Sequence, residues 1–394
     1  MVTAAEPSVR KGHSFRVVAG ALLASVALYA SGCAAVPMLA GTEPRVQSVP
    51  YRIAVFPVEN LSGRAAPLGD IRGLLVDRLA AHGLATVDDQ TLEQVLSRHR
   101  VRYTAGVERE LAKALKEETG AGAVLVPSLE HYDDVTPPRV AVFARLVSTG
   151  DDPRVLHVAG AGVAGDEAPG LLGMGLVDDP RALLTRVVDS LATSLAAREP
   201  GAESHPTGAR APAKFAPKIA YRSAALDARR TYSVAVVPFF NKSARKYAGE
   251  IVSLHMIRSL MASGRLAVVE PGVVRAELLR SRVIMTDGIS LSDTDTILNA
   301  VDADLVLNGE VLEYREPRGS GSPRVDFSVL VIERTTRRVV YSASSHNAGD
   351  DRVFFFDWGR VATGHALTAQ MSRAVTERML SAPATPAARR WAPR

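Results

Sequence analysis

The chain has 394 residues, of which 47% are hydrophobic and 5% aromatic, and it carries a net charge of +5. This length predicts two or three domains with cores of their own, and the mild charge, without a basic stripe, argues against nucleic-acid binding. A single cysteine, Cys33, excludes an internal disulfide and any paired-cysteine metal site.

Residues 1–32 have the three zones of a secretory signal. A polar head with three basic residues precedes the uncharged, largely aliphatic run at 17–30, and small residues follow. Such a run is too short to cross a bilayer core comfortably as a helix, which disfavours a transmembrane anchor. We therefore predict a signal peptide over 1–32.

The end of this segment, Ala30-Ser31-Gly32-Cys33, resembles a bacterial lipoprotein signal. The resemblance implies that Cys33 becomes the first mature residue and carries acyl chains, palmitate among them. Ala34 and Ala35 follow, without the Asp that commonly retains such proteins in the inner membrane. The implied location is the outer membrane, facing the periplasm. An ordinary secretory signal with an incidental cysteine is the alternative.

Composition divides the rest of the chain into folded and unfolded parts. Pro and Gly punctuate residues 33–50, and residues 199–230 contain four prolines without sustained apolar periodicity. The prediction is a tether over 33–50, a first α/β domain over 51–198, a linker over 199–230, a second α/β domain over 231–381 and a disordered tail over 382–394.

The two predicted domains are copies of one another. RIAVFPVENLSGR at 52–64 aligns with SVAVVPFFNKSAR at 233–245, and GAGAVLVPSLEHY at 120–132 aligns with DADLVLNGEVLEY at 302–314. A period this long indicates a tandem domain duplication. Features found in both copies are expected to belong to the fold, and features found in one copy are candidates for function.

Each copy predicts the same elements in chain order. A buried strand ends near a Pro, and an Asn-x-Ser turn, an amphipathic helix closed by Gly83 or Gly264 and a short strand follow. One or two helices, three strands with antiparallel hairpins and a last helix, at 180–198 or 359–380, complete the copy. The pattern βαβα(α)βββα predicts an α/β sandwich with helices packed on a mixed sheet.

Three stretches of the second copy, VAVVPFFNKS, GRLAVVE and DADLVLNGEV, resemble a family of envelope domains. The family includes the curli-secretion lipoprotein, the lipoprotein activators of penicillin-binding proteins and the amino-terminal domain of the Tol-system propeller protein. The resemblance implies an envelope location and protein partners. The channel-forming members insert extra amphipathic strands, for which the sequence offers no candidate.

A glycine motif at 160–165 matches the G-x-G-x-x-G spacing of dinucleotide sites. Such a site needs a helix N-terminus directly after the glycines to hold the pyrophosphate. The residues that follow, Asp166-Glu167-Ala168-Pro169, are acidic and break helices. The motif is therefore interpreted as a flexible loop.

Polar residues gather in the second copy alone at His346, Asp350 and Asp351. An imidazole with nearby carboxylates suggests a metal or acid–base site, whereas a turn around Asn347 is the structural alternative. The nearest further histidine, His365, fits a solvated helix face equally well. We expect no metal, no cofactor and no catalytic residue here.

Four aromatic residues follow this cluster, and three consecutive phenylalanines cannot all point inward from a strand, because side chains alternate. They are candidates for protein contact, with core packing as the alternative: Phe354, Phe355, Phe356 and Trp358.

The sequence thus predicts a lipid-anchored, non-enzymatic envelope protein whose domains bind other envelope proteins, in envelope assembly, secretion or cell-wall synthesis. Its partners are the membrane, through the lipid, envelope proteins of unknown identity, and a second copy of the chain as a further candidate. An oligomeric secretion-channel component related to the curli export lipoprotein is one alternative. A metal-dependent enzyme using His346, Asp350 and Asp351 is the other.

Overall fold

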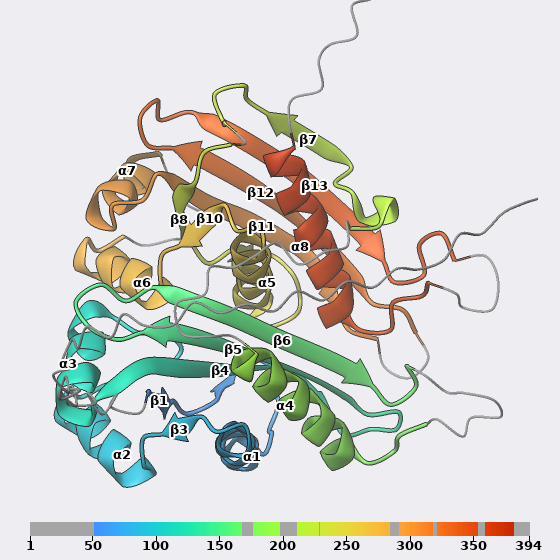
Figure 1. Cartoon of the computed structure of the whole chain (residues 1–394). Coiled ribbons are helices and arrows are strands. Elements are labelled where there is room, and N and C mark those ends of the chain that lie inside the picture. The colour runs from blue at the N-terminus through green and yellow to red at the C-terminus, as the bar shows by residue number, and fades with distance from the viewer. Residues whose placement is uncertain are drawn as a thin grey trace, which may run out of the picture. The chain divides into compact units, whose positions relative to one another are not determined.

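The computed structural model describes residues 51–167, 176–197, 211–227, 229–283, 291–317, 321–353 and 359–381 (Figure 1). These residues belong to one compact unit, Ser48–Arg394. They form two mixed sheets with helices packed on them, which confirms the predicted fold class. Among the described helices, none combines the length and the apolar character that a membrane span requires.

The first half has the predicted order of elements. They are β1 (Arg52–Val55), β2 (Glu59–Asn60), α1 (Leu68–Ala81), β3 (Ala85–Thr86), α2 (Asp89–Arg98), α3 (Arg109–Thr119), β4 (Ala121–Asp133), β5 (Arg139–Ser148), β6 (Val155–Ala164) and α4 (Pro180–Ala196). The sheet order is β3-β1-β4-β5-β6, with β2 paired to β4. Strand β1 lies parallel to its two neighbours, and β4, β5 and β6 are antiparallel.

The second half repeats this order. Its elements are β8 (Tyr232–Val236), β9 (Phe240–Asn241), α5 (Ala248–Ala262), β10 (Leu266–Val268), α6 (Pro271–Arg280), α7 (Leu291–Ala300), β11 (Leu305–Arg315), β12 (Arg324–Glu333), β13 (Val339–Ala348) and α8 (Gly364–Leu380). The sheet order β10-β8-β11-β12-β13 matches the first sheet strand for strand. The structure thus confirms the duplication and the βαβα(α)βββα pattern.

The Asn-x-Ser turn is built in the same way in both halves. The amide of Asn60 donates to the carbonyl of Arg64 (2.7 Å), and the Ser62 hydroxyl donates to Oδ1 of Asn60 (2.6 Å). In the second half, Asn241 and Ser243 make the equivalent hydrogen bonds at 2.7 Å each. Both pairs are turn residues, as predicted.

The structure corrects the predicted linker between 211 and 227. Strand β7 (Ile219–Arg222) pairs antiparallel with β13 and becomes the edge of the second sheet. Before it, a short 3-10 turn (Ala213–Phe215) buries the Phe215 ring completely. The prolines interrupt the apolar spacing of this segment, so its sequence shows no strand pattern.

The glycine motif is also corrected, because Gly160 and Gly162 lie in strand β6 rather than in a loop. A Cβ atom on Gly160 would lie 2.7 Å from the Phe143 ring, and one on Gly162 would lie 2.8 Å from His365. The glycines therefore permit close packing of β6 against Phe143 and His365.

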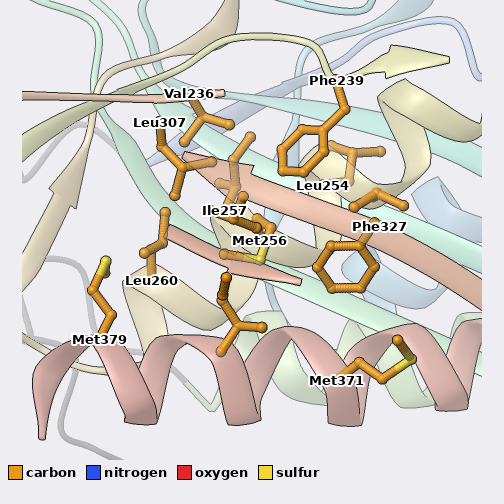
Figure 2. Close-up of a cluster of buried hydrophobic side chains, with 14 of the residues drawn as sticks. Val236, Phe239, Leu254, Met256, Ile257, Leu260, Leu307, Phe327, Met371 and Met379 are labelled. Carbon is orange, nitrogen blue, oxygen red and sulfur yellow. The ribbon is translucent and has the colours of Figure 1, made fainter. Parts of the chain in front are cut away.

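Helices α5 and α8 connect the two halves. One face of each helix packs on the second sheet, where Met371 and Met379 of α8 join Ile257 and Leu260 of α5 in one buried hydrophobic cluster (Figure 2). This core also takes in four residues from the first half, Leu61, Phe143, Val155 and Val158. Helices α1 and α4 cover the opposite face of the first sheet. The layers are therefore α1/α4, first sheet, α5/α8, second sheet.

Candidate functional site

The structure does not gather the predicted polar cluster of the second copy into one ligand set. His346 and Asp350 are exposed at the end of β13 and in the turn after it. Asp351 closes that turn, because its Oδ2 accepts from the Asn347 amide (2.8 Å) and the Ala348 N–H (3.0 Å). The turn interpretation accounts for these contacts. Cys33, Phe354, Phe355, Phe356 and Trp358 lie outside the described residues.

Three other titratable residues meet at the junction of the halves. Glu130 comes from β4, His255 from α5 and His365 from α8, and their exposed fractions are 0%, 1% and 5%. Oε2 of Glu130 contacts Nδ1 of His365 and lies 3.4 Å from Nε2 of His255. One ligand atom from each residue lies within 4.8 Å of the others, a spacing found in no other such group among the described residues.

The surroundings fix the protonation of this cluster. Burial alone would raise the pKa of Glu130, but the two imidazoles hold it well below its ordinary value. Burial lowers the pKa of His255 to about 4, so its imidazole is neutral at pH 7 despite the adjacent carboxylate. The Tyr314 hydroxyl donates to Oε1 of Glu130 (2.6 Å), and Arg245 donates to the Glu130 carbonyl (2.6 Å). The carboxylate is thus ionised and held in place.

The sequence contains a signal for this cluster in the differences between its two copies. In the aligned copies, Leu312 stands opposite Glu130 and Leu74 opposite His255, so the polar residues occur once. Of the two alternatives for His365, the solvated face is wrong, because that face of α8 packs on β6 and the side chain is buried.

A buried ion pair also joins the halves. Arg145 of β5 and Glu270, at the start of α6, are 2% and 0% exposed, with Nε and Oε2 3.1 Å apart. Arg145 also donates to the Ala105 carbonyl (2.7 Å), and the Val107 N–H donates to Glu270 (3.1 Å). Arg145 and Val107 belong to the first half and Glu270 to the second. These bonds therefore tie the first half to the start of α6 and fix how the halves meet.

Helices α5 and α8 contact one face of the first sheet, and the equivalent face of the second sheet is open. In the strand registers, Phe143 lies between Ser128 and Gly160, and Ser328 lies between Glu310 and Ser344. Phe143 and Gly160 contact His255 and Arg258 of α5, whereas their counterparts line a hollow of about 430 Å³. The hollow is lined mainly by β11, β12 and β13, with Ile219 of the edge strand 73% exposed beside it.

No protein-family model and no curated protein matches the sequence. Several solved structures are similar to parts of it. The PelC dodecamer from Paraburkholderia phytofirmans is 21% identical, covers 40% of this chain and 96% of its own, and has a TM-score of 0.26. Lipoprotein GNA1162 from Neisseria meningitidis is 22% identical, with coverages of 37% and 99% and a TM-score of 0.28. The LpoB C-terminal domain from Salmonella enterica is 12% identical, with coverages of 32% and 87% and a TM-score of 0.25.

Proposed function

We propose that this chain is a lipid-anchored protein on the periplasmic side of the outer membrane, which binds other protein chains and catalyses no reaction. The lipoprotein-type signal ending at Cys33 and the envelope-type strand motifs support the location. Envelope assembly, secretion or cell-wall synthesis is the setting in which such an anchor and such domains act. The observation that carries the binding role is the open face of the second sheet.

The absence of catalysis is supported by where the titratable groups lie. The side chains of Glu130, His255 and His365 are at most 5% exposed, and burial to this degree suits a structural site. The exposed group, His346 and Asp350, forms no ligand set with Asp351, whose carboxylate is used by the turn.

The partner for the open face is a second copy of this chain. Inside one chain, a sheet face of the first half meets the helix pair of the second half, so the contact joins two different surfaces. A contact of this kind repeats head to tail, and it gives rings where the rotation closes. The next contact in the series would place helices α1 and α4 of one copy on the open sheet face of another.

The two surfaces are suited to each other in shape. The outer side of α1 carries Gly69 and Gly73, which face open space and leave the helix surface flat. The hollow on the sheet is lined by small side chains, among them Ser328, Ser342 and Ser344. The lining of the hollow mixes these serines with apolar side chains such as Leu330 and Ile219, as in interfaces between chains that also exist alone.

Single substitutions on each surface are expected to abolish the assembly. Leu330→Arg places a charge in the hollow, and Gly73→Arg places one on the outer side of α1. We expect the wild-type protein in detergent to have the mass of several mature chains by light scattering, and each variant to have the mass of one. Glu117→Arg, on an exposed side of α3, is the matched control and should assemble normally. A monomeric wild-type protein would exclude this partner.

Replacing Cys33 by alanine tests the anchor. Because a lipoprotein signal is processed only after acylation of its cysteine, Cys33→Ala should remove palmitate labelling and release the protein from outer-membrane fractions. Ser31→Ala, which leaves the cysteine in place, should label as the wild type does. Labelling that survives in Cys33→Ala would rule out the lipid anchor.

A further inference from the structure

The cluster of Glu130, His255 and His365 is not explained by protein binding. It occurs once in the duplicated fold, joins elements of both halves, and lies in the interior instead of on the proposed contact surfaces. A buried polar group normally has a hydrogen-bond partner, and exceptions require an explanation. Both ring nitrogens of His255 are buried, and neither makes a hydrogen bond of normal geometry to a residue that the structure describes, although Nε2 lies 3.4 Å from Oε2 of Glu130.

We propose that Glu130, His255 and His365 bind a transition-metal dication, with zinc as the principal candidate. Two imidazole nitrogens and one carboxylate oxygen form a ligand set that zinc accepts, and all three ligand atoms already lie within 4.8 Å of one another. The metal would take the lone pair of His255 Nε2, for which no residue that the structure describes supplies a donor.

The protonation of the ligands agrees with this geometry. Metal ligation requires an ionised carboxylate and imidazole nitrogens with a free lone pair. The Glu130 carboxylate accepts the Tyr314 hydroxyl hydrogen through Oε1, and Nε2 of His255 is used by no hydrogen bond among the described residues. The cations that face the cluster do not enter it, because Arg245 binds the Glu130 carbonyl and Arg258 lies beside Gly160.

The surrounding residues orient the ligands as outer-shell groups do in metal sites. Tyr314 donates to the carboxylate oxygen that the histidines leave free, and the Arg245 guanidinium stacks 4.5 Å from the Tyr314 ring. Phe143 packs edge-on to His255, with the ring centres 4.7 Å apart. Such partners hold the ligand atoms in place before the metal arrives. Because Glu130 belongs to the first half and the histidines to the second, the bound metal would fasten the halves together.

Zinc binding to the metal-stripped full chain tests the proposal. We expect about one zinc ion per chain by calorimetry and a higher melting temperature in its presence, because a ligand that binds the folded state stabilises it. Glu130→Gln and His255→Gln should each weaken binding at least about 100-fold, and Tyr314→Phe about 10-fold. His346→Gln, at an exposed histidine, is the control and should bind as the wild type does.

Cobalt provides a measurement that needs no variant. The Co²⁺-loaded wild-type protein should show the visible absorption of a low-coordinate nitrogen and oxygen site, and zinc should displace it. A wild-type protein that binds neither ion, or a folded Glu130→Gln variant that binds both normally, would overturn the proposal. The monomeric Leu330→Arg variant should keep the site, so failure of the assembly and failure of the metal site are distinguishable.

Discussion

Replacing Arg145 by methionine is expected to lower the free energy of unfolding by about 3–5 kcal/mol, because it leaves the buried Glu270 carboxylate without its counter-charge. Glu270 is completely buried, so its charge has no access to water. Urea denaturation followed by circular dichroism measures the change. This loss of stability should be among the largest of any single substitution, since the ion pair joins the two halves of the chain.

Two further variants separate the ion pair from the loss of a large side chain. Arg154→Met, at a side chain that is 73% exposed, should change stability by no more than about 0.5 kcal/mol. The double variant Arg145→Met/Glu270→Leu should recover most of the loss, because no unpaired charge remains. A single Arg145→Met variant as stable as the wild type would show that the pair does not hold the halves together.

Replacing Gly272 by alanine should cost about 3 kcal/mol, because the halves touch there through backbone atoms. A Cβ atom on Gly272 would lie 2.3 Å from the Val107 nitrogen and 2.7 Å from the Gly106 carbonyl carbon. Backbone atoms cannot rotate away as a flexible side chain can, so α6 would have to move away from the first half. Thermal unfolding followed by calorimetry measures this loss.

The matched control for this substitution is another helical glycine. Gly73 of α1 has open space where its Cβ would be, so Gly73→Ala should raise stability by about 0.5–1 kcal/mol through helix propensity alone. If Gly272→Ala were equally stabilising, the close contact between α6 and the first half would not exist in solution.

The duplicated fold could be predicted because both copies carry the same local signals. Asn60 and Asn241 make the same turn, and Gly83 and Gly264, both with positive φ, follow equivalent helices. Such features depend on residues close in sequence, so a single sequence shows them. The edge strand β7 was missed because it pairs with β13, more than a hundred residues later in the chain.

The buried cluster could not be predicted, because its members are far apart in the sequence. Glu130 and His365 are separated by 235 residues, and each looks ordinary in its own element. His346 and Asp350 drew attention because they are neighbours in sequence, yet the turn places them at the surface. Comparing the copies residue by residue would have indicated Glu130 and His255, since leucines replace them in the other copy.

Mixing the two surface variants tests the central claim, that the open sheet face binds the helix pair of another copy. Leu330→Arg keeps an intact helix pair and Gly73→Arg keeps an intact sheet face, so an equal mixture retains one working contact per pair. Head-to-tail assembly predicts that the monomers combine into 1:1 dimers and grow no further, as measured by light scattering. A mixture that stays monomeric, or that restores the full assembly, would contradict it.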